Sequence, residues 1–341
     1  MSAEPSGRAP GSGLTGPGGA GFPGVAGAEH ASPDDAGTTA GFLVGLDIGG
    51  SHTRGALFHG NEPLRTARSG SANVQNVSRG AAHNALRCVL TELAAPPGTP
   101  VIAGAGGVDS PHDAAVLADL LRSAGSLDPA TPVRAVHDTR LILAAGGLTA
   151  GIALIAGTGS VAWGVDATGR EARAGGWGYL LGDEGSGYWI GREAVRRVLA
   201  EAQRAGTSDV ANGARTHGDL ARAVLNHVGA ETPTDLIAAF HEHPERTRWA
   251  GLARPVCELA ERGDPAARVL VADAAAHLSG LVLTAAATLG QQLPTVVGGG
   301  LAGSMVGRGL AGFLEDRGIT VTLLEREPML GAPLLARTLL R

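Results

Sequence analysis

The stretch FLVGLDIGGSHTRGALFHG, residues 42–60, decides the fold. It opens with an apolar run of β type that ends in glycines, and TRGALFHG (53–60) is typical of a returning strand, so a hairpin with a glycine turn is expected. The pattern recurs in GIALIAGTGS (151–160), which is followed by a second hairpin bent at DATG within 161–174. A third apolar strand with a glycine loop lies at 294–304. The chain therefore carries a weak internal duplication.

Apolar residues at helical spacing occupy most of the chain between these strands. The expected helices are 78–94, 113–124, 139–146, 189–205, 216–228, 232–242, 247–262, 264–290 and an apolar helix at the C-terminal end. Further strands are expected at 100–108, 132–138 and 319–325. This order predicts an α/β protein with two domains, 41–148 and 149–341, around a cleft. The final helix, about 329–341, is expected to be able to pack back on the first domain.

The composition excludes several function classes. The net charge of −5 gives no basic face for nucleic acid or for an anionic membrane. All 27 basic residues are arginine, which excludes a Walker A loop, the strand lysine of protein kinases and Schiff-base chemistry, since each needs a lysine. Cys88 and Cys257 lie far apart with no C-x-x-C motif, so no disulfide framework or metal cage is predicted. A small-molecule partner is the expectation that remains.

Two segments bear on where the protein is found. Residues 1–40 are rich in glycine and proline and lack an apolar core run, which predicts a disordered tail and not a signal peptide. Residues 141–165 carry no charge, yet their glycines and the polar Thr158-Gly159-Ser160 divide them into a helix end, a strand and a turn. We therefore expect no membrane span and a cytoplasmic protein.

Three glycine turns follow buried strands: DIGGSHT (47–53), AGTGS (156–160) and VGGGLAGS (297–304). A turn without Cβ atoms lets backbone N–H groups approach phosphate oxygens, and an adjacent hydroxyl adds a donor. Each turn alone is a weak signal, because tight strand ends need glycine anyway. Three turns in matching strand contexts favour a phosphate ligand, and the lack of G-x-G-x-x-G after the first strand disfavours a Rossmann dinucleotide site.

The order of these motifs resembles a known superfamily. DIGGSHT, the Asp in HDTR (137–140), IAGTGS, GGWGYLLGDEGSGYWIG (175–191) and VVGGGLAGS are similar to the ATPases that include sugar kinases, heat-shock proteins and actin. Over about residues 42–341 the chain resembles N-acetylglucosamine kinases of the BadF/BadG/BcrA/BcrD group. The resemblance implies two ribonuclease-H-like (actin-like ATPase) domains flanking a nucleotide cleft, with ATP and Mg²⁺ as cofactors. It also implies that a homodimer is common.

The resemblance assigns roles to residues of the turns. Asp47, at the end of the first strand, would hold Mg²⁺ through water. Phosphate oxygens would be contacted by Gly49, Gly50, Ser51 and Thr53 from the first domain and by Gly157, Thr158 and Gly159 from the second. Adenosine would lie against Gly298, Gly299 and Gly300.

Asp138 is the candidate catalytic base. Phosphoryl transfer needs a carboxylate that receives the proton of the sugar hydroxyl and holds its oxygen in line with the γ-phosphate. From the residues alone, an N-cap of the helix at 139–146 explains Asp138 equally well, because Asp is among the preferred N-cap residues. The family pattern favours the catalytic role, although His137 stands where Asn is expected most often.

The segment 175–191 is the candidate sugar site. Carboxylates accept hydroxyl hydrogen bonds, aromatic faces cover the apolar side of a sugar ring, and glycines let backbone amides come close. By resemblance, the amino sugar would be held by Asn73, Gly176, Trp177, Gly178 and Asp183. Tyr188 and Trp189 are expected to pack in the core, while Glu184 stays open between a supporting and a structural role.

The leading hypothesis is an ATP-dependent kinase for the 6-hydroxyl of N-acetylglucosamine or glucosamine, with no nucleic-acid or membrane partner. One alternative is an ATPase activator of a partner enzyme. Such activators hold an iron–sulfur cluster through cysteines at a dimer interface, and Cys88 with Cys257 does not offer that arrangement. The other alternative is a sugar sensor without catalysis.

Overall fold

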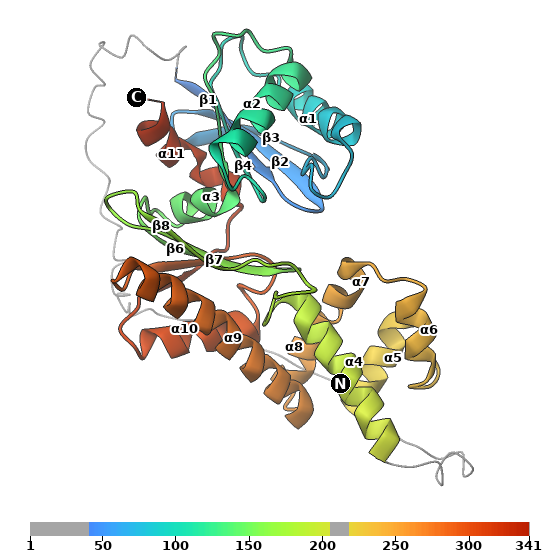
Figure 1. Ribbon diagram of the computed structural model, residues 1–341. Helices are drawn as coiled ribbons and strands as arrows, with labels where there is room; N and C mark the ends of the chain where they lie inside the picture. The colour runs from blue at the N-terminus through green and yellow to red at the C-terminus, as the bar shows by residue number, and fades with distance from the viewer. Residues whose placement is uncertain (1–40, 205–217, 341) are drawn as a thin grey trace, which may run out of the picture. The chain divides into compact units, whose positions relative to one another are not determined.

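The computed structural model describes residues 41–204 and 218–340 (Figure 1). The tail expected at residues 1–40 lies outside the described residues. The described residues all belong to one compact unit, which is built on two five-stranded sheets.

The first sheet confirms the opening hairpin. Its strands are β1 (Phe42–Ile48), β2 (His52–His59), β3 (Glu62–Gly70), β4 (Val101–Ala105) and β5 (Val133–His137), in the order β3-β2-β1-β4-β5. β1 pairs antiparallel with β2 and parallel with β4. β3 was not expected from the sequence, because Ala67 is its only buried residue and the strand presents no apolar run.

Helices cover both faces of this sheet (Figure 1). α1 (Arg79–Leu93) and α2 (Pro111–Gly125) share one core with Val44 and Leu46 of β1. α3 (Asp138–Ala145) shares the opposite core with Leu43. Burial on both faces explains why residues 42–48 form a continuous apolar run and do not alternate with polar residues.

The second sheet repeats the topology of the first. Its strands are β6 (Gly151–Ala156), β7 (Ser160–Val165), β8 (Glu171–Gly175), β9 (Thr295–Gly298) and β10 (Val321–Leu323), in the order β10-β9-β6-β7-β8. β6 pairs antiparallel with β7 and parallel with β9, as β1 does with β2 and β4. The duplication predicted from the glycine turns is therefore a repeated sheet topology.

Helices α4–α8 follow β8 in the chain. Their bounds are α4 (Gly187–Arg204), α5 (Asp219–Val228), α6 (Asp235–His241), α7 (Arg246–Gly251) and α8 (Ala253–Glu261). The single helix expected at 247–262 is wrong, since α7 and α8 are separated at Leu252. Pro255 has no N–H to bond the carbonyl of Gly251, which favours a break at this point.

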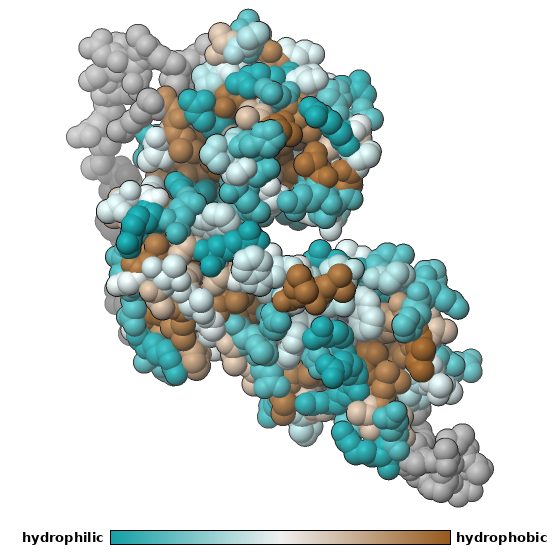
Figure 2. Space-filling model, viewed as in Figure 1, coloured by the Kyte–Doolittle hydropathy of each residue, from teal (hydrophilic) through white to brown (hydrophobic). Residues whose placement is uncertain are grey.

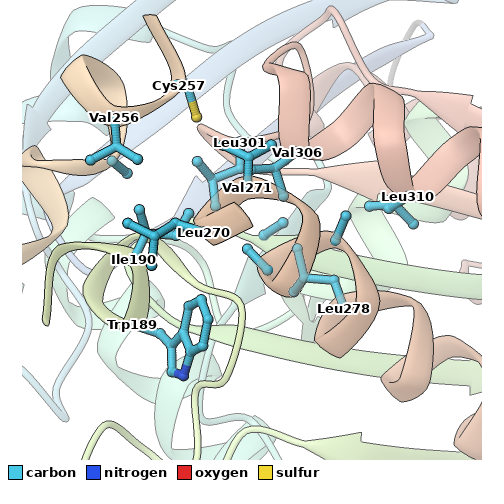
Figure 3. Packing of buried hydrophobic residues seen from close by; sticks show 14 of the residues in the cluster. Trp189, Ile190, Val256, Cys257, Leu270, Val271, Leu278, Leu301, Val306 and Leu310 are labelled. Carbon is cyan, nitrogen blue, oxygen red and sulfur yellow. The ribbon is translucent and has the colours of Figure 1, made fainter. Parts of the chain in front are cut away.

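The long helix α9 (Pro265–Leu289) packs on β6, β7 and β8 and lies beside α8 and α10 (Met305–Glu315). Among the described residues it is the one helix long and apolar enough to cross a membrane, but half of its apolar window is buried inside the protein. Figure 3 shows this core, in which Trp189 of α4 and Val256 of α8 lie near Leu270 and Leu278 of α9. Burial of Trp189, and of Tyr188 before it, confirms their expected core packing.

The chain returns to the first sheet at its C-terminal end. The short helix η2 (Pro328–Gly331) and α11 (Ala332–Leu339) pack on β1 and α3. Met329 and Leu335 share the core that contains Leu43. Arg326, just before η2, donates hydrogen bonds to the carbonyl of Ala145 at the end of α3. The expected domain boundary at residue 148 stays a prediction.

Candidate active site

A cavity of about 780 Å³ is lined by loops that follow strands of both sheets. It brings together most of the residues predicted from sequence: Asp47, Gly49, Gly50, Ser51, Asn73, Asp138, Thr158, Gly159, Gly176, Asp183, Gly299 and Gly300. A second cavity of about 540 Å³ is lined by Gly157, by the Ser304 loop and by α8 residues such as Glu258. Thr158 and Gly300 line both cavities, so one extended ligand could occupy the two.

Four predicted residues lie outside both cavities. Thr53 is fully buried, and its hydroxyl accepts a hydrogen bond from the Ala72 N–H at 2.9 Å. Gly298 is buried within β9. Trp177, next to Gly178, is 65% exposed with the Arg173 guanidinium 5.3 Å from its ring. The face drawn in Figure 2 mixes hydrophilic residues with several groups of hydrophobic residues.

Asp47 lies at the end of β1, directly opposite Arg54 of β2 in the strand register. The side chain is buried, and its Oδ2 lies 3.6 Å from Nη1 of Arg54, whose Nε lies 3.3 Å from Oε1 of Glu327. Burial raises the pKa of Asp47 to about 6, with Glu327 adding to the rise and Arg54 opposing it. A buried carboxylate that also lines a cavity is suited to bind a cationic ligand there.

Asp138 is the first residue of α3, and it is not the N-cap. His137 occupies that position, and its Nδ1 accepts a hydrogen bond from the Thr139 N–H at 3.3 Å. Nδ1 also lies 3.0 Å from Oδ1 of Asp138, but a nitrogen that accepts from Thr139 has no proton to donate there. The buried Oδ1 consequently has no hydrogen-bond partner among the described residues. The capping explanation for Asp138 is therefore wrong, and its Oδ1 is left for another partner.

The charge state of this pair follows from its surroundings. Burial, and then the negative charges of Asp47 and Asp109, raise the pKa of Asp138 to about 7. Burial lowers the pKa of His137 to about 4, so its ring is neutral at pH 7. The ring stacks on Trp163 of β7, with centroids 4.3 Å apart. Asp138 can thus take up a proton near neutral pH.

Asp183 is held tightly on the opposite side of the cavity. It adopts a left-handed backbone conformation with φ of +63°. Its Oδ1 accepts from the Ser160 N–H at 3.1 Å, and its Oδ2 accepts from Nη2 of Arg246 at 3.2 Å. Any Cβ at Gly159 would lie 2.9 Å from both carboxylate oxygens, so the glycine turn is what admits Asp183 here. Burial raises the pKa of Asp183, while Ser160 and Arg246 oppose the rise.

Asn73 is fixed by the loop that carries it. Its Nδ2 donates to the carbonyl of Gly106 at 3.0 Å, and its Oδ1 accepts from the Gln75 N–H at 2.9 Å. Both groups belong to the first half of the chain, so the side chain is oriented before any ligand arrives.

Several residues that line the cavity were not assigned to the site from the sequence. These are the charged side chains Arg54, Asp109, Arg173, Arg246 and Glu327, among others. Arg54 stands beside the first glycine turn, and that neighbourhood could have identified it. Arg246 belongs to no motif, and its position depends on how α7 packs against the segment 175–191.

Comparison with known proteins identifies the chain. The sequence pattern of the BadF/BadG/BcrA/BcrD ATPase family matches residues 44–336. The chain belongs to this family. Membership of an ATPase family implies that this BadF-type protein uses ATP.

Relatives of this BadF-family chain include named sugar kinases. It is 28% identical to the N-acetylmuramic acid/N-acetylglucosamine kinase of Clostridium acetobutylicum, over 70% of this chain and 76% of that protein. It is 32% identical to the N-acetyl-D-glucosamine kinase of Dictyostelium discoideum, over 44% of this chain and 46% of the relative.

Among solved structures, a provisionally named N-acetylglucosamine kinase from Chromobacterium violaceum has a TM-score of 0.66 and 27% identity. The match covers 88% of this chain and 99% of that one. Together with the two repeated sheets, this similarity identifies two ribonuclease-H-like domains of the actin-like ATPase fold.

Proposed function

We propose that this protein is a kinase that transfers the γ-phosphoryl group of ATP to the 6-hydroxyl of an amino sugar, N-acetylglucosamine or glucosamine. The observation that carries the proposal is the single cavity lined by Asp47, Asp138 and the Thr158 turn. The names of the relatives support the same substrate class.

The nucleotide would extend across the two cavities. Thr158 and Gly300 line both, so phosphates at the glycine turns would leave the nucleoside in the cavity beside α8. Asp47 would hold Mg²⁺, which when bound supplies positive charge to the phosphate oxygens. Among the described residues no group of three or more ligating side chains occurs. One carboxylate still fits, since Mg²⁺ is usually held by one or two carboxylates together with waters and substrate phosphates.

The acceptor sugar would lie between Asn73, Gly176 and Asp183, all of which line the same cavity. Asp138 would receive the proton of the 6-hydroxyl on its carboxylate and keep that hydroxyl oxygen directed at the γ-phosphate. The rigid hydrogen bonds of Asn73 and Asp183 pre-orient the acceptor, and orientation is a large part of what such an enzyme supplies. A cytoplasmic location and a homodimer stay predictions.

ADP release measured with a panel of sugars tests the proposal. Turnover that depends on N-acetylglucosamine or glucosamine, with the 6-phosphate identified by NMR, is the expected result. Turnover without any sugar would instead indicate an ATPase activator, and no turnover at all would indicate a sensor. The ratio of kcat/KM for the two sugars decides whether an acetamido or a free amino group is preferred.

A further inference from the structure

Arg246 reaches the cavity from outside the motif segments. It is the first residue of α7, and its Nη2 donates to Oδ2 of Asp183, 63 positions earlier in the chain, at 3.2 Å. The guanidinium carbon also lies 5.2 Å from the ring centroid of Tyr179. A single side chain therefore fixes two residues of the segment 175–191.

The guanidinium of Arg246 is only partly used by the protein. An arginine carries five N–H donors, and among the described residues only Nη2 makes a hydrogen bond. Nε is buried and has no hydrogen-bond partner in the described part of the chain, while 38% of the side chain is exposed and the residue lines the cavity. Thr247, the next residue, lines it too. Arg246 therefore has N–H donors available for a ligand next to the carboxylate oxygens of Asp183, which can accept.

The charges nearby favour a neutral ligand over a phosphate. Asp183 lies against the guanidinium and cancels much of its positive charge, and the charge of Glu184 acts on the same carboxylate. A hydroxyl group donates one hydrogen bond and accepts others, so it matches a carboxylate and a guanidinium placed side by side. A phosphate oxygen only accepts and would be repelled by Asp183.

We infer that Arg246 is a substrate-binding residue that determines specificity: its free N–H groups donate hydrogen bonds to a ring hydroxyl of the sugar, and that hydroxyl donates a hydrogen bond to Asp183. The inference rests on the proposed function, because it names a contact with the acceptor sugar. It adds a residue from the helical part of the chain to a site that the motifs place on turns and strands.

Deoxy sugars test this contact directly. The variant Arg246→Met keeps the length of the side chain and removes its donors. With the full sugar, kcat/KM should fall roughly 10- to 100-fold, the usual effect of a lost hydrogen bond to a charged group, mostly through KM. With the 3-deoxy or 4-deoxy analogue that lacks the contacted hydroxyl, wild type and variant should be equally slow.

Arg248→Met is the matched control. Arg248 lies on the same helix, also has a buried Nε without a partner among the described residues, and contacts Phe240 and the carbonyl of Val228 without lining either cavity. Its kcat/KM should match wild type once folding is checked by circular dichroism. If Arg246→Met does not fold, Arg246→Lys, which keeps the charge but loses the planar donors, should show a smaller loss with the same dependence on the hydroxyl.

Three results would overturn the inference. An equal loss with every analogue would mean a structural role, a raised KM for ATP alone would mean a phosphate contact, and an unchanged kcat/KM would mean no contact. These outcomes differ from failure of the proposed function, which would show as no sugar-dependent turnover in wild type and would remove the inference with it.

Discussion

At the scale of single residues, the structure bears on the two roles that the residues alone left open for Asp138, N-cap of α3 or catalytic base. The N-cap is the neighbouring residue, His137, whose imidazole takes that role. The carboxylate is then left buried with an oxygen that has no partner among the described residues. A buried, unpaired acceptor costs stability and is retained where it serves a ligand.

The pH dependence of turnover follows from these surroundings. Asp138 accepts a proton only when ionised, and its pKa is raised to about 7, with that of Asp47 raised to about 6. We predict that kcat/KM for the sugar rises with pH through this range, with apparent values that belong to the coupled pair. A pH–rate profile of the free enzyme checks this, and a flat profile across it would contradict the assignment.

At this scale, sequence reasoning placed correctly the candidate functional side chains that lie at the ends of strands. Asp47 lies near the end of the buried strand β1, Asp138 directly follows β5, and both reach the cavity as expected. It failed for Arg246 and Arg173, because the partner of a long side chain depends on which helix or strand packs beside it. Trp177, expected at the sugar, is exposed beside Arg173 and outside both cavities, and its contact with the sugar stays a prediction.

At the scale of elements, the strands and helices were largely predictable from apolar runs and their spacing. The exceptions have physical reasons. β3 shows no apolar pattern because only one of its residues is buried. α7 and α8 form two helices and not one because the chain breaks beside a proline. Neither feature produces the periodicity on which sequence reasoning depends.

The contact between η2 and α3 is close enough to test by a single substitution. A Cβ at Gly331 would lie 2.5 Å from the carbonyl oxygen of Leu141 and closer still to the Ala145 nitrogen. Gly331→Ala should therefore lower the free energy of unfolding by about 1–3 kcal/mol, as overpacking of a core does. Thermal unfolding measures this. Gly312→Ala on α10, where a Cβ meets no atom within 4 Å, should leave Tm unchanged or raise it.

At the scale of the whole molecule, the outer face of the β7–β8 hairpin contacts the first half of the chain at three points. Trp163 stacks on His137, Glu171 pairs with Arg140 of α3 at 3.0 Å, and Arg173 pairs with Asp109 at 3.4 Å. The repeated glycine turns predicted two similar halves, but these contacts could not be predicted, because they join residues distant in the chain.

Loss of the Trp163 stack should slow turnover. Without it, His137 and the start of α3 are held less firmly relative to the Thr158 turn, and an aromatic pair contributes about 0.5–1.5 kcal/mol. We predict that Trp163→Leu lowers kcat roughly 2- to 10-fold, in proportion to that energy. Phe42→Leu, which removes a similar contact with His59 away from the cavity, should leave kcat unchanged; equal effects of the two variants would contradict a positioning role for Trp163.

The most direct measurement is the turnover of Asp138→Asn with saturating ATP and N-acetylglucosamine, set beside calorimetric binding of the sugar. An amide of the same shape cannot take the hydroxyl proton, so kcat should fall roughly 10²- to 10⁴-fold while the sugar still binds. Turnover close to that of wild type would show that the cavity does not use Asp138 as its base.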